Sequence, residues 1–386
     1  MASAGSVVES AGITSIDGNA RSGPEKRVLL VSNRVMHYRV SVYNYFWRHF
    51  RENGWEFAVL SNELQRQNRN QCQFEFTEKP FNFSTYRAEI KRFNPDAVIL
   101  FLHMKDRILW PLIHWLKLSG IPVALWTKAR NLDDVDNRVR NAFFDYLHWI
   151  SDGLVLYTES LKRFIPEKQW PKVFVANNTI NFEDFPSITE SKEQIKRDLG
   201  IPFEKIVLFA GRIGEEKNRK KVDHLIDLFS TLERKDAGLV IVGSGLSDEL
   251  RARINPANTF YLGEVHDAEN RQISRIFTMA DICSIPGHVG LGLNQAFFFG
   301  LPMVTEWGNQ PPEIEYLHDG ENGFLVAEDD KAALRERLMF LLDNDRERKR
   351  MSANARRDIL SNASIEGMFQ GFLGCVQYMT RAKHHQ

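Results

Sequence analysis

Residues 27–32 read Arg-Val-Leu-Leu-Val-Ser and are followed by Asn33. A short apolar run of this kind predicts a strand that is buried on both faces, as in a parallel sheet. Similar runs recur along the first half of the chain, with helical segments between them. The predicted strands are 27–32, 57–60, 97–102, 123–126, 153–157 and 173–175, and the predicted helices are 40–51, 84–93, 107–119, 134–149 and 159–165. This alternation predicts βαβ units around a parallel sheet.

The same pattern restarts after Pro186, beyond a stretch without periodicity at 181–186. The second set of predicted strands is 206–210, 238–242, 260–262, 282–284 and 303–305, and its helices are 219–233, 247–254, 270–279, 291–299, 331–343 and 345–359. We therefore expect an α/β protein with two doubly wound domains, which bind ligands at the carboxyl ends of their strands. A last helical stretch, 364–381, has no strand after it.

The expected division of the chain has four parts. These are a mobile tail at 1–25, an N-terminal Rossmann-like domain at 26–183, a C-terminal Rossmann-like domain at 184–363, and the last helix within 364–386. The tail is small and polar, without a sustained period, which is typical of a disordered terminus.

Composition excludes several classes of protein. Of the 386 residues, 43% are hydrophobic, which supplies enough material for packed cores and excludes general disorder. The 3 cysteines form no CxxC pair, which argues against a disulfide scaffold or a zinc site and fits a reducing compartment. No apolar run reaches the length of about 18 residues that a membrane span needs. The start also lacks the layout of a signal peptide. A cytoplasmic protein is expected.

Charge is distributed unevenly along the chain, although the formal net charge is zero. Residues 26–185 carry 23 Lys and Arg against 17 Asp and Glu, whereas residues 186–386 carry 26 against 30. A basic first half and an acidic second half indicate domains with different partners, and random scatter explains so small a difference equally well.

The segment 107–119 allows two interpretations. Its Trp, Leu and flanking Lys and Arg residues suit a helix that lies on a membrane surface, at the inner face of a membrane if the protein is cytoplasmic. However, Leu109, Leu112, Ile113 and Leu116 have the spacing of a helix packed on a sheet, which favours a core position. Peripheral membrane contact is therefore a secondary expectation.

The first segment that indicates chemistry follows the predicted strand 206–210. It reads Gly211-Arg212-Ile213-Gly214-Glu215-Glu216-Lys217. An Arg and a Lys at the carboxyl end of a parallel strand predict a site for a polyanion such as a diphosphate, because Arg offers a planar fork and Lys a mobile point charge. The alternative is a solvated charged loop.

A second segment, 286–296, places several glycines before the predicted helix 291–299. Glycines let backbone amides approach a phosphate closely, and the helix would direct the positive end of its dipole toward it. Gly300 then ends this helix. Taken alone the pattern is weak, because packing explains most glycine-containing turns.

In the first domain, His37, Tyr38 and Arg39 follow the first predicted strand. Ligands bind at such strand ends, so these three residues are candidates to bind a ligand. Tyr38 could stack on a ring of the ligand, and Arg39 could pair with an anionic group. Tyr43 and Phe46 lie three residues apart on the following helix, and this spacing favours a core position for both.

Seven elements in order resemble the retaining GT-B glycosyltransferases of family 4. They are Gly211–Lys217, Val242–Gly245, Leu262–Val265, Ala280–Asp281, Gly300–Val304, Pro312–Ile314 and Asp319–Val326. The resemblance covers nearly all of 206–360. The first half of the chain is less similar to the family. It matches mainly through its alternation of predicted strands and helices and through Ala176–Ile180.

The resemblance implies a GT-B enzyme in which two domains face a cleft and the last helix crosses back onto the first domain. The donor would be a nucleoside diphosphate sugar of the UDP or GDP type. The acceptor would bind the first domain at His37, Tyr38 and Arg39, where Tyr38 could stack on a sugar face. Arg212 and Lys217 would then bind the donor diphosphate, the backbone at Glu264 and Val265 would contact the base, and amides of Val289, Gly290 and Leu291 would contact phosphate.

Two departures from the family pattern bear on the donor. Family members usually carry a Glu-x7-Glu pair where this chain has Gly287 and Gln295, so His288 or backbone groups would have to contact the sugar, and Gln295 the ribose. A family His near the reacting carbon is replaced by Lys128, which we add to Arg212 and Lys217 as a candidate catalytic residue.

The function expected on these grounds is metal-independent, retaining transfer of a hexose-type unit to a glycan or lipid-linked glycan, as in polysaccharide or lipopolysaccharide biosynthesis. No cofactor and no nucleic-acid partner is expected. One rival is a nucleotide-sugar-binding protein of the same fold that has lost turnover. Another is a GT-B-like phosphorylase or epimerase. A Rossmann dehydrogenase is disfavoured, because no Gly-x-Gly-x-x-Gly follows the first strand.

Overall fold

The structure of the protein is a computed structural model. It describes residues 26–64, 72–101, 106–214, 219–265, 267 and 269–383. The tail expected at 1–25 and the candidate site residue Lys217 lie outside the described residues.

The first half of the chain folds around a seven-stranded parallel sheet with the order β3-β2-β1-β4-β5-β6-β7. Its strands are β1 (Lys26–Val31), β2 (Trp55–Ser61), β3 (Glu75–Glu78), β4 (Ala97–Phe101), β5 (Val123–Thr127), β6 (Gly153–Leu156) and β7 (Val173–Val175). The helices are α1 (His37–Glu52), α2 (Phe83–Phe93), α3 (Leu109–Leu118) and α4 (Arg138–Ile150), followed by the short 3-10 helices η1 (Glu159–Phe164) and η2 (Glu167–Lys172).

The second half folds around a six-stranded parallel sheet with the order β10-β9-β8-β11-β12-β13. Its strands are β8 (Lys205–Ala210), β9 (Ala237–Val242), β10 (Thr259–Gly263), β11 (Ile282–Ser284), β12 (Met303–Glu306) and β13 (Gly323–Val326). The helices are η3 (Phe182–Asp184), α5 (Lys192–Asp198), α6 (Val222–Ser230), α7 (Asp248–Ala252), α8 (Arg271–Met279), α9 (Leu291–Phe298), η5 (Pro312–Tyr316), α10 (Lys331–Asp343), α11 (Asp345–Asn362) and α12 (Ile365–Lys383).

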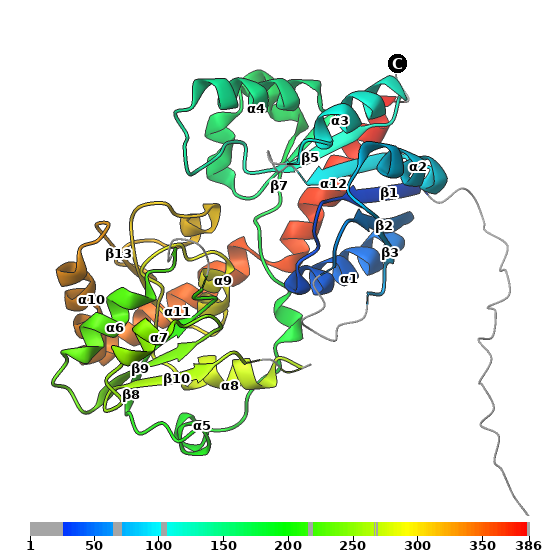
Figure 1. The fold of residues 1–386 in the computed structure, drawn as a ribbon. Helices are drawn as coiled ribbons and strands as arrows, with labels where there is room; N and C mark the ends of the chain where they lie inside the picture. The colour runs from blue at the N-terminus through cyan, green and yellow to red at the C-terminus, as the bar shows by residue number, and fades with distance from the viewer. Residues whose placement is uncertain are drawn as a thin grey trace, which may run out of the picture.

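Each sheet has its own hydrophobic core, and Figure 1 shows the two halves as separate lobes. Central strands are buried on both faces. In β1, for example, Val28, Leu29, Leu30 and Val31 are all buried. Helices cover both faces of a parallel sheet, so its strands read as continuous apolar runs, and this is why they could be predicted. The expected pair of doubly wound α/β domains is confirmed.

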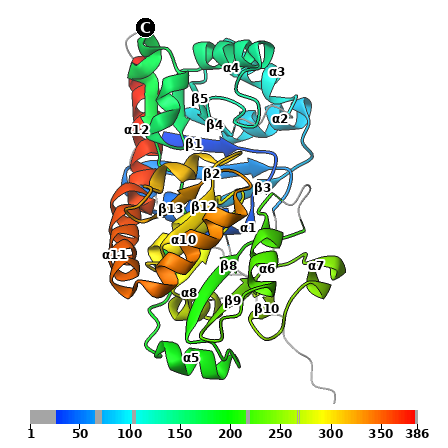
Figure 2. The ribbon, with the colours of Figure 1, turned by 90° about the vertical axis from the view of Figure 1, so that its left-hand side faces the viewer.

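The last helix returns to the first domain, as expected. Figures 1 and 2 show α11 on the second domain and α12 running from it along the first. The Phe372 ring lies 4.9 Å from the Phe46 ring and 5.1 Å from the Trp126 ring, measured between centroids. A Cβ on Gly371 would lie 2.6 Å from the Val175 carbonyl oxygen, so only glycine permits this approach of α12 to β7.

Most predicted elements are present, and the differences have local causes. The edge strands β3 and β13 and the helix α5 were missed. The strand β3 reads Glu-Phe-Thr-Glu, without an apolar run, and Gly323–Val326 was noted only as part of a motif. The helix expected from residue 134 begins at Arg138, where the Asn137 side chain accepts a hydrogen bond from the Arg140 amide (3.0 Å). The segment 159–165 forms the 3-10 helix η1 in place of an α-helix.

Core positions within the predicted helices are also confirmed. Tyr43 and Phe46 are buried in α1. The four residues that favoured a core position for 107–119 are buried as well; they are Leu109, Leu112, Ile113 and Leu116. None of the helices in the described part of the chain is long and apolar enough to cross a bilayer.

The buried face of α4 contains His148, whose exposed fraction is 0%. Neither of its ring nitrogens has a hydrogen-bond partner among the described residues. Burial, together with the charges of Arg130 and Lys172, lowers the pKa of His148 to about 3. The imidazole is therefore neutral in the folded protein, whereas in the unfolded chain it binds a proton below about pH 6.5.

The lower pKa of His148 in the folded state predicts that this residue makes the protein less stable in acid. A His148→Leu variant should not show this contribution. Because the unfolded state binds the extra proton, the free energy of unfolding should fall by about 2 kcal/mol between pH 7.5 and pH 5 on account of this residue. Urea unfolding at the two pH values measures it, with the exposed His318 changed to Asn as the control. An equal loss in wild type and His148→Leu would contradict the assignment.

Candidate active site between the domains

A cavity of about 1030 Å³ lies between the two domains, at the carboxyl ends of strands from both sheets. It is lined by all thirteen described residues that the sequence analysis proposed as donor-binding, acceptor-binding or catalytic. They are His37, Tyr38, Arg39, Lys128, Gly211, Arg212, Glu264, Val265, His288, Val289, Gly290, Leu291 and Gln295. Residues far apart in the sequence are thus brought to one cavity. Lys217 belongs to the segment 215–218, which is not described.

On the second domain, the cavity meets the amino end of α9. Gly290 precedes this helix with φ +55°, and no side chain caps its first turn. Gly290, Leu291 and Gly292 all line the cavity. The first amides of a helix lack intrahelical partners, and the helix dipole adds partial positive charge there. This end of α9 can therefore receive an anionic group.

The loop before α9 is held from behind by two side chains. The Gln310 amide donates from Nε2 to the Gly287 carbonyl (2.9 Å) and accepts at Oε1 from the Val289 amide (3.1 Å). The Thr305 hydroxyl donates to the Ile285 carbonyl (2.7 Å). Thr305 and Gln310 are buried, so these bonds are shielded from water. They fix the path of the loop 285–289. The Val289 amide, expected to contact phosphate, is occupied by Gln310, so the amides of Gly290 and Leu291 remain as the candidates.

On its other side, the same loop pairs with the backbone just before α6. The Gly287 amide donates to the Lys220 carbonyl (3.1 Å), and the His288 amide donates to the Arg219 carbonyl (2.8 Å). A Cβ at Gly287 would lie 2.0 Å from the Arg219 carbonyl oxygen. The glycine is therefore required by this close approach, and a glutamate at this position would push the two segments apart.

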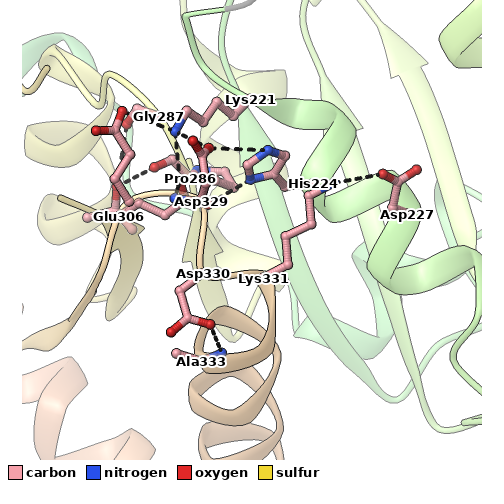
Figure 3. A network of polar contacts seen from close by, with 12 residues as sticks. Lys221, His224, Asp227, Pro286, Gly287, Glu306, Asp329, Asp330, Lys331 and Ala333 are labelled. Atoms are coloured by element: carbon pink, nitrogen blue, oxygen red, sulfur yellow. Dashed lines mark hydrogen bonds and ion pairs between the residues drawn. The ribbon is translucent and has the colours of Figure 1, made fainter. Parts of the chain in front are cut away.

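An ion-pair network anchors the start of α6 to the end of β12 (Figure 3). Glu306 is fully buried; its carboxylate lies 2.9 Å from the Lys221 ammonium and 2.7 Å from His224 Nδ1. Lys221 also lies 2.7 Å from the Asp329 carboxylate. Burial opposes the charge on Glu306, yet the hydrogen bonds from His224 and Lys221 hold its pKa below the ordinary value.

His224, Glu306 and Asp329 are close enough together to resemble a metal site. The Lys221 ammonium lies within ion-pair distance of both carboxylates, so the described side chains hold the cluster together as an ion-pair network. The network fixes the position of Lys221, whose backbone has φ +51°. It thereby also fixes the carbonyls of Arg219 and Lys220, which accept hydrogen bonds from the loop before α9.

The first domain contributes His37, Tyr38, Arg39 and Lys128 to the opposite wall. The Arg39 side chain is buried and donates to Asn178 Oδ1 (2.6 Å) and to the Thr179 carbonyl (3.4 Å). Its guanidinium also lies 4.8 Å from the Trp126 ring centroid. Arg39 therefore joins α1 to the segment that connects the domains. Its guanidinium is engaged there, whereas the sequence analysis expected it to pair with an anionic group of the ligand.

Lys128 and His288 give the middle of the cavity its electrostatic character. The Lys128 ammonium lies 5.5 Å from the Tyr157 ring centroid and makes no ion pair with any described residue. Burial and the nearby charges of Arg219, Lys220 and Lys128 lower the pKa of His288 to about 3. A neutral imidazole thus lies among cations, an arrangement that suits a neutral sugar next to an anionic group.

Several lining residues were given no role by the sequence analysis. Asn178 donates to Glu313 and accepts at its carbonyl from Asn294 Nδ2 (3.1 Å), so it links the connecting segment to η5 and α9. Gln310 also lines the cavity. Pro312–Ile314 was noted as a motif without a role for Glu313, and nothing in the local sequence around Gln310 indicates its contacts.

Comparison with known proteins supports a glycosyltransferase. The model of the family described as "Glycosyl transferases group 1" matches residues 191–358, most of the second domain. The chain is 26% identical over 201 residues to spore coat protein SA of Bacillus subtilis, covering 48% of this chain and 52% of that protein.

A second relative is the phosphatidyl-myo-inositol mannosyltransferase of Mycobacterium leprae. The two chains are 34% identical over 157 residues, covering 39% of this chain and 40% of that protein. The chain thus matches about half the length, or less, of these curated relatives.

Among solved structures, the fold is similar to that of Anabaena HepE in complex with UDP, with a TM-score of 0.72 and 14% sequence identity. The likeness covers 91% of this chain and 99% of that one. The fold is therefore of the GT-B type, with two Rossmann-like domains and a cavity between them.

The close approach at Gly287 predicts the effect of adding a side chain there. A Gly287→Ala variant should separate the loop from Arg219, displace the amino end of α9, and weaken nucleoside diphosphate binding about tenfold or more, or ~1.4 kcal/mol. Calorimetric titration measures the affinity. Gly367→Ala, at an exposed position of α12, is the matched control. Binding as tight as in wild type would contradict this account of the loop.

Proposed function

We propose that the protein is a retaining glycosyltransferase that moves a hexose-type unit from a nucleoside diphosphate sugar to a glycan or lipid-linked glycan, without a metal ion. The observation that carries this proposal is the convergence of Arg212 and the amino end of α9 on one interdomain cavity. Both offer hydrogen-bond donors and positive charge to a diphosphate.

The chemical step requires stabilisation of the charge that develops on the departing diphosphate. In the proposed mechanism, the bond between the anomeric carbon and the diphosphate oxygen breaks while the acceptor hydroxyl oxygen bonds to the same face of that carbon. An oxygen of the leaving phosphate accepts the hydroxyl proton. The negative charge would be stabilised by Arg212, Lys217 and the amides of Gly290 and Leu291. Such preorganised donors make a large contribution to lowering the activation free energy.

The donor is proposed to lie against the second domain. The backbone at Glu264 and Val265 would contact the base, and Gln295, in the second turn of α9, would hydrogen-bond the ribose. The donor is of the UDP or GDP type. The UDP complex of HepE, whose fold is similar, supports a nucleoside diphosphate as a ligand.

The sugar is proposed to lie between Lys128 and His288, and the acceptor against His37 and Tyr38. A Lys128 ammonium without an anionic partner among the described residues can offset phosphate charge or hydrogen-bond sugar hydroxyls. The proposed location is the cytoplasm. Cys283 and Cys375 are buried as thiols, which suits a reducing compartment.

A second candidate is a protein that binds nucleotide sugars without transferring them. It is favoured by Gly287, where the approach of the Arg219 carbonyl leaves no room for an acidic side chain facing the sugar. Incubation with a panel of nucleotide sugars separates the two. Transfer, or slow release of nucleoside diphosphate, supports the enzyme, whereas binding with neither supports the second candidate.

The diphosphate assignment predicts that Arg212→Ala and Lys217→Ala each lower kcat by about 10²- to 10³-fold, because each removes a donor that is needed most as charge develops. Steady-state kinetics with the donor identified by the panel measure the loss. Arg335→Ala, at an exposed position of α10, is the control. Circular dichroism establishes that the variants are folded. Folded Arg212 and Lys217 variants with normal turnover would refute the diphosphate assignment.

A further inference from the structure

The solvent-facing side of α4 is apolar. Val139 is 71% exposed, Phe143 49%, Tyr146 40% and Trp149 66%. Their spacing along the helix places them on one side of it. The other side of α4 is also apolar, and Phe144 and Leu147 are buried there. A helix at a protein surface normally presents polar residues to water, so the outer side of α4 lacks the expected polar cover.

The apolar side of α4 continues onto α3. The Trp110 ring meets the Phe143 ring edge-on at 5.1 Å between centroids. His114 Nε2 lies 2.7 Å from the Tyr146 hydroxyl, and the two rings are stacked. Leu118, near the end of α3, is 89% exposed. We define the α3–α4 surface by Trp110, Leu118, Val139, Phe143, Tyr146 and Trp149.

Of the large hydrophobic residues exposed in the described parts of the chain, nearly half belong to this surface. Exposed apolar residues scattered singly are normal, but a continuous patch marks an interaction site. Figure 1 shows α3 and α4 at the top of the first domain. The high exposed fractions of their outer residues show that the second domain does not cover the surface.

Charges near the α3–α4 surface favour an anionic partner. Arg107 lies just before α3 and Arg138 begins α4; both are exposed, and neither forms an ion pair with a described residue. Nearby, the carboxylates of Asp134, Asp145 and Asp152 are held in ion pairs, which leaves two unpaired arginines against one unpaired carboxylate, Asp136, among the described residues. Trp and Tyr side chains beside Arg are typical of surfaces at the level of lipid headgroups, where the rings enter the apolar boundary and the cations meet phosphate.

The same helix also reaches the cavity. Arg140 and Phe144 of α4 line it, as does Asp133 of the preceding loop, which lies 3.4 Å from Arg219 of the second domain. A bilayer in contact with the α3–α4 surface would therefore lie next to the wall where the acceptor is proposed to bind.

We propose that the α3–α4 surface binds a membrane containing anionic lipids and that the acceptor is a lipid-linked glycan presented there. The statement about the acceptor rests on the proposed function, whereas the statement about membrane binding does not. Membrane contact was a secondary expectation for 107–119 alone. The structure adds α4. Because this helix is apolar on both sides, its sequence did not predict which side faces water.

Vesicle sedimentation without substrates tests the membrane part by itself. Wild type is expected to sediment with vesicles of phosphatidylcholine and phosphatidylglycerol, and much less with phosphatidylcholine alone. A Phe143→Asn/Trp149→Asn double variant should reduce the bound fraction at least tenfold, because each substitution removes apolar area that binding buries. Trp307→Asn, which removes an exposed Trp of the second domain, is the matched control and should bind as wild type does.

An Arg107→Gln/Arg138→Gln double variant tests the charges. It should lose most of the preference for phosphatidylglycerol, and raising the salt concentration should have less effect on its binding. Nucleoside diphosphate affinity, measured on the same proteins, should be unchanged in both double variants. If the wild-type protein binds the nucleotide but does not bind vesicles, the membrane proposal is contradicted and the proposed function is unaffected.

Two further outcomes would overturn the proposal. One is vesicle binding by the Phe143→Asn/Trp149→Asn variant that equals that of wild type. The other is a wild-type dimer in light scattering that this variant converts to monomer, since the α3–α4 surface would then bind a second copy of the chain. With membrane binding established, transfer to lipid-linked acceptors in vesicles should fall in this variant, whereas hydrolysis of the donor should not.

Discussion

The close contact between Gly287 and the Arg219 carbonyl is the constraint on which the candidate site depends. It lets the loop before α9 hydrogen-bond to the backbone of Arg219 and Lys220, while Gln310 holds the same loop from behind. The buried Glu306 and its partner Lys221 fix the position of the backbone that the loop meets. The uncapped amino end of α9 is thereby placed at the cavity by contacts that exist before any ligand binds, which is the preorganisation that anion binding and catalysis need.

The position of the first domain relative to this site depends on contacts around the connecting segment. Arg39 and Asn294 both bind Asn178, which also donates to Glu313, so α1, α9 and η5 are joined at one residue. The return of α12 adds Phe372 to the aromatic core around Phe46. Buried polar contacts at Asn178 therefore hold the wall with His37, Tyr38 and Lys128 opposite α9, and α12, which follows α11 of the second domain, packs on the first.

The sequence predicted the fold well because both sheets are parallel and buried, so most strands appear as apolar runs. It predicted the candidate site in part. Residues at strand ends, such as Gly211 and Arg212, could be found, because their position along the chain determines their position at the sheet edge. The contacts of Gln310 and Asn178 could not, since they join segments that only the complete fold brings together. The sequence analysis noted only that Gly287 stands where family members usually carry a glutamate. The structure gives a steric reason for the glycine.

The central claim is that the second-domain wall of the cavity binds the diphosphate of a nucleotide, and calorimetric titration with nucleosides of increasing phosphate content tests it most directly. Uridine, UMP and UDP are compared with guanosine, GMP and GDP at low and high salt. We predict that the diphosphate of one base binds about a hundredfold more tightly than its nucleoside, or ~2.7 kcal/mol, and that salt reduces this difference. Equal affinity for the nucleoside and the diphosphate, or no binding of either series, would contradict the account.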